Sequence, residues 1–397
     1  MLVFILNAGS SSLKYQLMNP VIKKVFASGI CERIGIDGVL KHEYGDGKEL
    51  KLEIDMPTHK EAIEAVLSTL TVGEGKVIDS IDSIQATGHR VAHGGEFFQK
   101  STLVTEEVIA KIEALIPLAP LHNPANILGM KICQELLPGK PNVAVFDTVF
   151  HQTMPDYAYM YALPYDQYTK HKIRKYGFHG TSHYYVSNEA RQMLDKKRNT
   201  RIIVCHLGNG SSVTAVLNGK SIDTSMGLTP VQGLMMGTRS GDVGAGAISY
   251  MMKQEGLDID QITELMNKKS GILGISGKSS DLREVLAAMH DDERCRLAVD
   301  MVAYNIKKYV GSYVAALDGV DALCFTGGIG ENSALIREIV CTGLDGMGLV
   351  LDPIKNNKNR NDARDIATNS SAARIFVIPT NEEYVIANDT YKVVMES

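Results

Sequence analysis

The sequence predicts an α/β fold built in two halves, because strand-like and helical segments alternate and one strand–turn–strand pattern occurs twice. Residues 6–11 (LNAGSS) end an apolar run and precede an alternating segment that contains Leu13, Tyr15 and Leu17. Residues 207–212 (LGNGSS) also follow an apolar run and precede a β-branched one, about half a chain later. A Gly/Ser turn between two strands is typical of a β-hairpin. We therefore expect a duplicated domain core.

The remaining chain alternates between the two kinds of segment. Apolar residues recur at helical spacing in residues 60–70, and residues 260–269 and 294–317 also have a helical pattern. Ser280 and Asp281 predict a helix start, with the helix running to Met289. The apolar runs 143–146 and 322–325 are predicted strands that lead into Asp147 and into a glycine cluster, respectively.

Composition limits the class of protein. The chain has 397 residues, 44% hydrophobic and 22% charged, which is typical of a soluble globular protein of two domains. A net charge of −5 argues against a nucleic-acid or anionic-membrane partner. No apolar run approaches the ~20 residues of a membrane span, and the apolar start stops at Asn7 without a basic flank, unlike a signal peptide.

The cysteines lack the spacing of zinc sites or of a disulfide framework. We expect them to be buried, small apolar residues of a cytosolic protein. They are Cys31, Cys133, Cys205, Cys295, Cys324 and Cys341.

Three glycine-rich segments at strand ends, residues 7–12, 206–212 and 327–332, are candidates for phosphate binding. Only such turns let backbone N–H groups approach a phosphate closely. The third precedes a predicted helix over residues 333–340, whose N-terminus favours an anion. Any one of them alone is more simply a tight turn, but three in one chain favour a nucleotide site. Residues 271–279 only imitate a Walker A loop, because Ile272 stands where that motif needs glycine and the preceding segment is predicted to be helical.

Several charged side chains lie in unusual surroundings. Arg90 and Arg239 are flanked by glycines, and arginine suits a carboxylate or a transferring phosphoryl group. Asp147 ends an apolar strand, a common functional position in α/β folds. His179 and His183 have the spacing of a zinc pair, but Gly180-Thr-Ser182 is a poor helix interior, so zinc binding is the minor alternative.

Nine segments in order along the chain resemble the acetokinase family of short-chain fatty acid kinases, essentially from end to end. They are residues 7–14, 88–95, 146–153, 176–183, 206–212, 236–242, 279–283, 325–332 and 378–383. The resemblance implies reversible transfer of the ATP γ-phosphate to the carboxylate of acetate, giving acetyl phosphate and ADP by direct in-line displacement. Propionate kinase activity, with a larger acyl pocket, is the alternative. An assembly ATPase of the same broad fold is less consistent with two glycine-flanked arginines.

The resemblance also implies two actin-like (ribonuclease-H-like) domains of the acetate and sugar kinase/heat-shock ATPase/actin superfamily, with a cleft between them. Residues 1–149 plus 384–397 would form the acceptor-side domain, and residues 150–383 the nucleotide-binding domain. Family members are homodimers, and we expect the same here.

Transferred to matching positions, the family's catalytic residues are Asp147, His179 and Arg239, and Arg90 holds the acceptor carboxylate. Asp147 would orient Arg90 and contribute indirectly to a magnesium site. Asn7 and Glu382 would be the metal-site residues for Mg²⁺, with Mn²⁺ as a possible substitute. The implied ATP-binding residues are Lys14, His206, Leu207, Gly208, Asn209, Gly210, Asp281, Leu282, Arg283, Gly327, Gly328, Ile329, Gly330 and Glu331.

The implied acyl pocket consists of Ala92, Leu121, Phe178 and Pro230. A valine is common in the family where this chain has Ala92, so the pocket is expected to be wider. The acceptor carboxylate is ionised at pH 7, so the reaction needs no general base. Its difficulty is the repulsion between two anions, which two arginines and a magnesium ion would offset.

Overall fold

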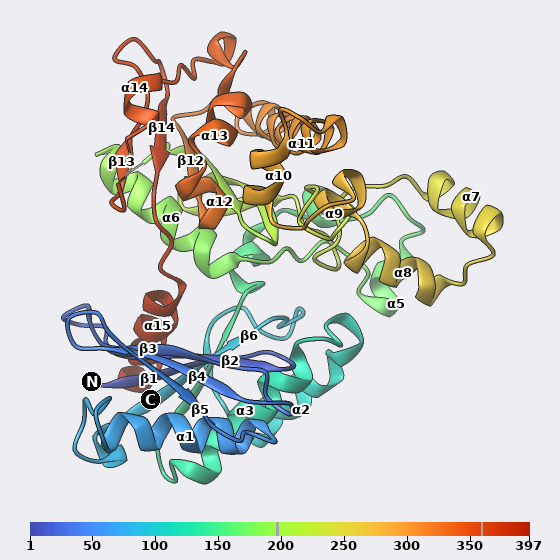
Figure 1. The fold of residues 1–397 in the computed structure, drawn as a ribbon. Helices are drawn as coiled ribbons and strands as arrows, with labels where there is room; N and C mark the ends of the chain where they lie inside the picture. Colours follow the sequence, from blue (N-terminus) through green and yellow to red (C-terminus); the bar gives the residue numbers. More distant parts are fainter. Residues whose placement is uncertain (196–197, 359) are drawn as a thin grey trace. The chain divides into compact units, whose positions relative to one another are not determined.

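A computed structural model describes residues 1–195, 198–358 and 360–397. The chain divides into two compact units (Figure 1). The first unit comprises Met1–Val149 and Asn381–Ser397, and the second comprises Phe150–Thr380.

The first unit is built on an eight-stranded mixed sheet in the order β5-β4-β3-β2-β1-β6-β8-β7. Its strands are β1 (Val3–Ala8), β2 (Ser12–Asn19), β3 (Lys24–Glu32), β4 (Val39–Tyr44), β5 (Lys48–Glu53), β6 (Ala86–Val91), β7 (Thr102–Leu103) and β8 (Asn142–Phe146). Strands β1, β6 and β8 are parallel neighbours, whereas β1 and β2 form an antiparallel hairpin.

Helices cover both faces of this sheet. They are α1 (His59–Thr71), α2 (Glu106–Ala114), α3 (Asn123–Leu136) and α15 (Glu382–Glu396), with short 3₁₀ turns at Ile81–Ser83 and Ile116–Leu118. On one face Phe4 and Leu6 pack with residues of α1 and α3. On the other, Val3 and Ile5 pack with Ile386 of α15, which lies beside the blue strands in Figure 1. This alternation is the period of two of a strand buried on both faces.

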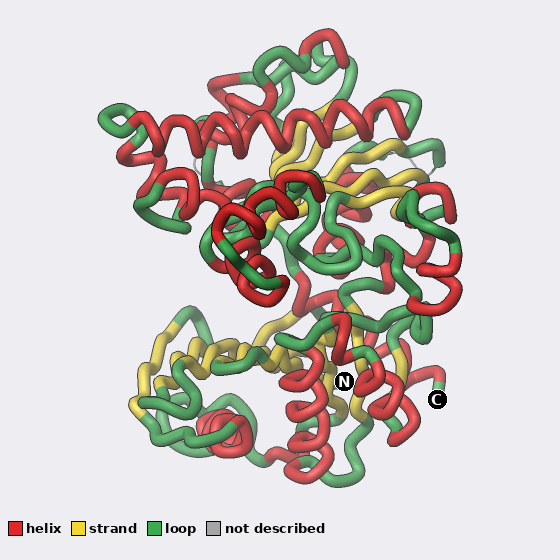
Figure 2. Tube along the Cα trace, turned by 90° about the vertical axis from the view of Figure 1, so that its right-hand side faces the viewer, coloured by secondary structure: helices red, strands yellow, loops and turns green. Residues whose placement is uncertain are grey.

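In the second unit the described residues form a six-stranded sheet in the order β11-β10-β9-β12-β14-β13. Its strands are β9 (Arg201–Leu207), β10 (Ser211–Leu217), β11 (Lys220–Thr224), β12 (Ala322–Thr326), β13 (Arg364–Asp365) and β14 (Arg374–Val377). The long helix α11 (Glu293–Ala316) lies along one face, as Figure 2 shows, and α6 (Gly180–Met193) packs on the other. The other helices are α4 (Asp156–Tyr159), α5 (Asp166–His171), α7 (Ala245–Glu255), α8 (Ile259–Lys268), α9 (Gly271–Ser276), α10 (Leu282–Ala288), α12 (Gly327–Asn332), α13 (Ala334–Cys341) and α14 (Pro353–Asn356). Further 3₁₀ turns are Val149–Thr153 and Asp345–Met347.

The two sheets repeat one topology. The order β3-β2-β1-β6-β8 in the first unit corresponds to β11-β10-β9-β12-β14 in the second. In both, an antiparallel three-strand meander adjoins two strands that run parallel to its first strand. The α/β fold in two halves and the duplicated hairpin are therefore confirmed.

The expected helices are present at 59–71, 259–268, 293–316 and 334–341, and Asp281 caps α10 as predicted. Two expectations were wrong. Residues 327–332 form a short helix, α12, rather than a turn, and residues 180–182 are the first turn of α6 rather than a poor helix interior. All six cysteines are free and buried. Among the described residues, none of the helices combines the length and the hydropathy that crossing a bilayer needs.

Candidate active site

In the first unit, Arg90 is held by Asp147 and Asn7. The Arg90 Nη2 lies 2.5 Å from Asp147 Oδ2, and its Nε donates to both carboxylate oxygens at 3.1 and 3.2 Å. Arg90 Nη1 donates to Asn7 Oδ1 at 3.2 Å. A guanidinium has five N–H groups, so one on Nη1 and one on Nη2 are left for another acceptor. Asp147 is fully buried, while the Arg90 side chain is 24% exposed and so remains accessible.

The topology explains why these three residues meet. Asn7 is near the end of β1, Arg90 is near the end of β6, and Asp147 directly follows β8. These strands are parallel neighbours, so their carboxyl ends lie at one edge of the sheet, where α/β proteins bind ligands. The negative charge of Asp147 is the largest of the influences that raise the pKa of Arg90, and Glu382 and Glu383 add to it. Glu382, at the start of α15, therefore lies within electrostatic range of this group.

Two buried asparagines support this edge, and the sequence interpretation missed them. Asn126 Oδ1 accepts from the backbone N–H of Ala92 at 3.1 Å, and its Nδ2 donates to the carbonyl of Ala8 at 2.9 Å. Asn123 exchanges hydrogen bonds with the backbone of His93. Both come from α3, and only the tertiary fold brings them to the strand ends. They fix the backbone just after Arg90 and just after Asn7.

Lys14 lies in the first unit, directly opposite Asn7 in the β1–β2 pair. The other residues predicted to bind ATP lie in the second unit.

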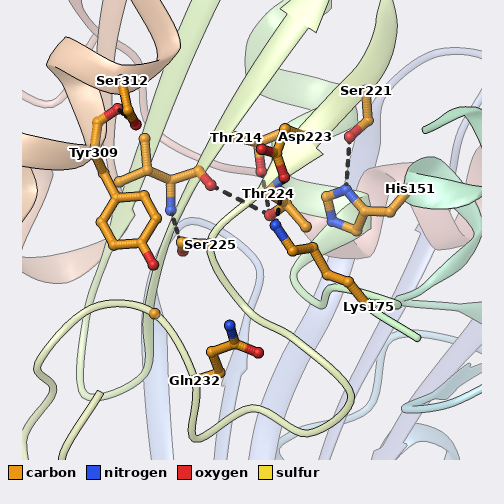
Figure 3. Close-up of polar contacts among 12 residues, drawn as sticks. His151, Lys175, Thr214, Ser221, Asp223, Thr224, Ser225, Gln232, Tyr309 and Ser312 are labelled. Carbon is orange, nitrogen blue, oxygen red and sulfur yellow. Dashed lines mark hydrogen bonds and ion pairs between the residues drawn. The ribbon is translucent and has the colours of Figure 1, made fainter. Parts of the chain in front are cut away.

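In the second unit, His179 occupies a constrained position before α6. Its backbone is left-handed, with φ of 56°. The Nε2 of the buried His151 donates to the carbonyl oxygen of Phe178 at 2.9 Å, which fixes the chain just before it. The other nitrogen of His151 contacts Ser221 Oγ at 2.9 Å (Figure 3). His179 Nδ1 lies 2.9 Å from Ser212 Oγ, and its ring centroid lies 4.3 Å from that of His206.

Arg239 lies in a loop that packs on the ends of two helices. The backbone N–H of Met236 donates to the carbonyl of Arg239 at 3.0 Å, which closes a turn. The backbone N–H groups of Ile272 and Leu273, in the first turn of α9, donate to the carbonyls of Met236 and Gly237 at 2.9 Å. Within the segment that resembles a Walker A loop, Gly271–Ser276 thus form α9, which supports the Arg239 loop.

Figure 3 shows how the same loop begins. The hydroxyl of Ser225, just after β11, accepts from the backbone N–H of Val213 at 2.9 Å, and the Thr214 and Thr224 hydroxyls lie 2.8 Å apart. Close by, Lys175 Nζ pairs with Asp223 at 2.6 Å. The loop is thus joined to the sheet at its start.

The guanidinium of Arg239 has no strong anionic partner. Its Nη1 is 3.4 Å from the carbonyl oxygen of Pro230 and 3.9 Å from Met236 Sδ. Within the described ranges, no carboxylate lies at salt-bridge distance from it. Burial lowers the pKa of Arg239, but a guanidinium stays charged at neutral pH. A Cβ placed on Gly210 would be 3.4 Å from His179 Nε2 and 3.5 Å from Arg239 Nη1, so both nitrogens face the same glycine turn.

A pocket of about 780 Å³ adjoins this turn, a size typical of small-molecule sites. It contains seven of the predicted nucleotide residues: Gly208, Asn209, Asp281, Leu282, Arg283, Gly328 and Ile329. Ser280, Leu286, Asn332 and Ser333 complete its lining. Asp281 caps α10 and pairs with Arg283, whose hydrogen bond lowers the pKa of Asp281 to about 2.

The other predicted nucleotide residues have different surroundings. Leu207 is buried in the core and His206 contacts the Ser182 hydroxyl. Glu331 Oε1 accepts from the backbone N–H groups of Gly327 at 2.9 Å and Thr380 at 3.2 Å. The buried Arg337, which the sequence interpretation missed, donates to the carbonyls of Gly330 and Glu331 at 2.8 and 2.9 Å. These side chains support both ends of α12, so they shape the loop at the pocket.

The predicted acyl-pocket residues divide between the units. Ala92 is buried and Leu121 is 62% exposed in the first unit. Phe178 and Pro230 belong to the second unit, where Phe178 packs with Met226 and Met236 in a small apolar cluster. The two methionines had not been predicted.

Within the described residues, no three His, Cys, Asp or Glu side chains are grouped as metal ligands. His179 and His183 both contact the Ser212 hydroxyl.

Comparisons with known proteins identify the family of the chain. The model of the acetokinase family matches residues 2–388. The chain is 54% identical to an acetate kinase of Fusobacterium nucleatum subsp. nucleatum, with 99% of each chain covered. The crystal structure of Porphyromonas gingivalis acetate kinase is 51% identical and matches with a TM-score of 0.95 over 99% of each chain. A propionate kinase structure from Francisella tularensis subsp. tularensis is 43% identical, with a TM-score of 0.92 over 99% of each chain.

The match covers essentially the whole chain and includes every segment that carries the site described above. The chain therefore belongs to the acetokinase family.

Proposed function

We propose that this enzyme transfers the γ-phosphoryl group of ATP to the carboxylate of acetate, giving acetyl phosphate and ADP. The observation that carries the proposal is Arg239, a cation without a carboxylate partner among the described residues, which faces the same glycine turn as His179 next to the pocket. Arg239 is partly buried, and a cation withdrawn from water without an anion is costly. The proposal accounts for that cost, because an anionic phosphoryl group would complete the site.

In this proposal Arg90 binds the acceptor. Asp147 and Asn7 hold the guanidinium, and its two remaining N–H groups are suited to one carboxylate. The acceptor is already ionised, so no side chain has to remove a proton. Asp147 orients Arg90 rather than acting on the substrate. Lys14, opposite Asn7, is proposed to contact the nucleotide phosphates.

Arg239 and His179 are proposed to donate hydrogen bonds to the equatorial oxygens of the transferring group. Hydrogen-bond donors that are already positioned where negative charge develops stabilise the transition state more than donors that must first reorganise. His179 is fixed by its backbone neighbour and by Ser212, and Arg239 by a loop joined to α9. The proposed nucleotide residues at β9–β10, α10 and α12, including Gly210, Gly327, Gly330 and Glu331, form or support the pocket.

The residues near Arg90 fit a magnesium ion. Asn7 offers an amide oxygen and Glu382 a carboxylate, and both are hard oxygen donors. Mg²⁺ commonly takes one or two protein ligands and completes its shell with substrate phosphates and water, so the absence of a cluster of three acidic or histidine ligands in the described ranges is compatible with it. Bound with ATP, the ion supplies positive charge against the phosphate oxygens. Mn²⁺, which also favours oxygen ligands, is expected to replace it.

Acetate is favoured over propionate as the main acceptor because the acetate kinases described above are 51% and 54% identical and the propionate kinase is 43% identical. Ala92, Leu121, Phe178 and Pro230 are proposed to line the acyl site.

We further propose that the protein acts as a homodimer in the cytoplasm. No residue of α7 is buried, and Leu297, Met301 and Tyr304 form an exposed apolar stripe on α11. A second copy of the chain would cover such surfaces. Six free thiols are consistent with a reducing compartment. Sedimentation at several concentrations tests the dimer, and a monomer at all of them would contradict it.

Trapping the product with hydroxylamine tests the reaction itself. With Mg²⁺ and ATP, we expect acyl hydroxamate from acetate, less from propionate and still less from butyrate. EDTA should abolish the product, and Mg²⁺ or Mn²⁺ should restore it. ADP release at the same rate without any carboxylic acid would contradict the proposal. With ATP that is chiral at the γ-phosphorus, the configuration at that phosphorus should be inverted in the product, because a single in-line displacement inverts configuration.

A further inference from the structure

We propose that His183 sets the proton arrangement of His179 through the hydroxyl of Ser212, so that His179 presents an N–H at Nε2 toward the transferring phosphoryl group. The inference deepens the proposed function and rests on it for the role of His179. His183 is a positioning residue here, because it acts through Ser212 and does not reach the glycine turn itself.

One hydroxyl joins the two histidines. Ser212 Oγ lies 2.9 Å from His179 Nδ1 and 2.7 Å from His183 Nε2. Ser212 and His183 are fully buried, so water does not compete for these contacts. A hydroxyl has a single proton to donate. If it donates to one imidazole, it must accept from the other.

The surroundings of His183 decide which atom donates in its hydrogen bond with Ser212. Its Nδ1 is buried and has no hydrogen-bond partner among residues 1–195, 198–358 and 360–397. A proton on Nδ1 would thus be a buried, unpaired donor, which native structures tolerate less than an under-used acceptor. The proton of a neutral His183 therefore belongs on Nε2, from which it is donated to Ser212.

The imidazoles that face His183 favour its neutral form. The rings of His151, His206 and His179 lie 5.7, 6.2 and 6.5 Å away. Burial, followed by the proximity of His151 and His206, lowers the pKa of His183 well below its usual value. His183 is thus a neutral donor at physiological pH.

The proton position on His183 determines the proton position on His179, because both rings contact the Ser212 hydroxyl. Among the described residues, the Ser212 hydroxyl contacts only His183 and His179. Because it accepts from His183, its own proton goes to His179 Nδ1, and a neutral His179 then carries its proton on Nε2. That nitrogen and Arg239 Nη1 lie within 3.5 Å of the same point beside Gly210. The reverse arrangement would place a proton on His179 Nδ1 and, in a neutral ring, turn a lone pair toward an anionic phosphoryl group.

Two substitutions remove the relay at different points. We expect Ser212→Ala and His183→Leu each to lower kcat about 10- to 100-fold, the range that losing the outer partner of a metal-bound histidine costs, with smaller changes in KM for ATP and acetate. His183→Gln, whose amide nitrogen can replace Nε2 as donor, should retain more activity than His183→Leu. The double variant should be no slower than the worse single variant, because both break one chain. The relay would be overturned if the fold-decrease in kcat of the double variant equalled the product of the two single decreases, or if Ser212→Ala had a normal kcat.

His42→Leu is the control, because His42 is also a buried histidine but lies in the first unit. Unlike His183, it makes hydrogen bonds through both ring nitrogens. It should lower the melting temperature without lowering kcat.

A direct measurement keeps the proposal testable if a variant fails to fold. In ¹⁵N-histidine-labelled wild-type protein, long-range N–H correlation spectra show which ring nitrogen holds the proton. We expect Nε2–H and an unprotonated Nδ1 for both His183 and His179, and a protonated Nδ1 on either would overturn the proposal. This readout does not depend on turnover, so it separates failure of the relay from failure of the proposed reaction.

Discussion

Replacing Asp147 by asparagine tests whether Arg90 must be held in place to bind the acceptor. The carboxylate of Asp147 accepts from Arg90 Nε and Nη2, and it has no exposed surface. Asparagine keeps the shape but removes the negative charge, and its NH₂ group would face another donor. The Arg90 guanidinium remains charged without Asp147, so the variant loses the fixed orientation of Arg90 but not its charge. Lowering the pH should therefore not restore activity.

The magnitude follows from the burial of the two partners. Truncating one partner of a buried, hydrogen-bonded charge pair costs ~2–5 kcal/mol of binding free energy. Because the Arg90 side chain is 24% exposed, water screens part of this cost, and we expect ~2–3 kcal/mol. At 1.36 kcal/mol per tenfold change, kcat/KM for acetate should fall about 30- to 150-fold. KM for ATP should change much less, because the pocket belongs to the second unit.

Asp321→Asn is the matched control. Asp321 is also buried and pairs with Arg201 at 3.3 Å, but it precedes β12 whereas the glycine segment follows that strand. Hydroxamate kinetics and thermal melting should be measured for both variants. We expect both variants to have a lower melting temperature, and only Asp147→Asn to lose activity with acetate. If both lose stability equally and both keep kcat/KM for acetate within about twofold of the parent, Asp147 is merely structural and the reasoning about Arg90 is refuted.

Three other outcomes are expected. Arg239→Ala should lower kcat about 100- to 1000-fold, as the loss of a transition-state donor does, and near-normal kcat would exclude Arg239 from the mechanism. If Ala92 lines the acyl site, alanine in place of the family's common valine should leave room for about one methylene, worth ~0.8 kcal/mol, so propionate should react within roughly tenfold of acetate. Ala92→Val should raise the acetate-to-propionate ratio of kcat/KM, and an unchanged ratio would refute the pocket assignment. Burial lowers the pKa of His89 and His93 to about 4 in the folded protein. The unfolded chain therefore binds more protons between about pH 6.5 and pH 4, and the free energy of unfolding should fall by roughly 2 kcal/mol per histidine from pH 7 to pH 5. Urea unfolding of the parent and of His89→Gln measures this, and equal pH dependence in both would contradict the assignment to His89.

The duplicated hairpin could be predicted because each copy carries its own signals. Apolar strands flank a Gly/Ser turn in both, and no distant residue is needed to recognise them. The start of α10 was equally local, since Asp281 accepts from the backbone N–H of Arg283. Arg90, Asp147 and Asn7 were grouped by the family resemblance, and only the strand-end position of Asp147 was read from the sequence itself; the parallel strands of the structure explain why all three meet at one edge of the sheet.

The remaining features depend on contacts between distant segments. Glycine-rich α12 is an unlikely helix by propensity, yet Glu331 and Arg337 satisfy the backbone groups at its two ends. The contact between His183 and Ser212 joins residues 29 positions apart, and nothing in the spacing of the histidines indicates a shared serine. Leu121 was chosen by resemblance alone, and its large exposure within the first unit could not be read from the sequence.

The place of α15 in the first unit has a consequence for how the protein is made. Residues 382–396 cover the sheet face formed by Val3, Ile5, Val143 and Val145, yet they leave the ribosome after the whole second unit. During synthesis this apolar face is therefore exposed to water or to a chaperone while more than two hundred residues are added. The second unit, which is contiguous in sequence, can complete its core first. The half that begins the chain is thus expected to be the last to fold.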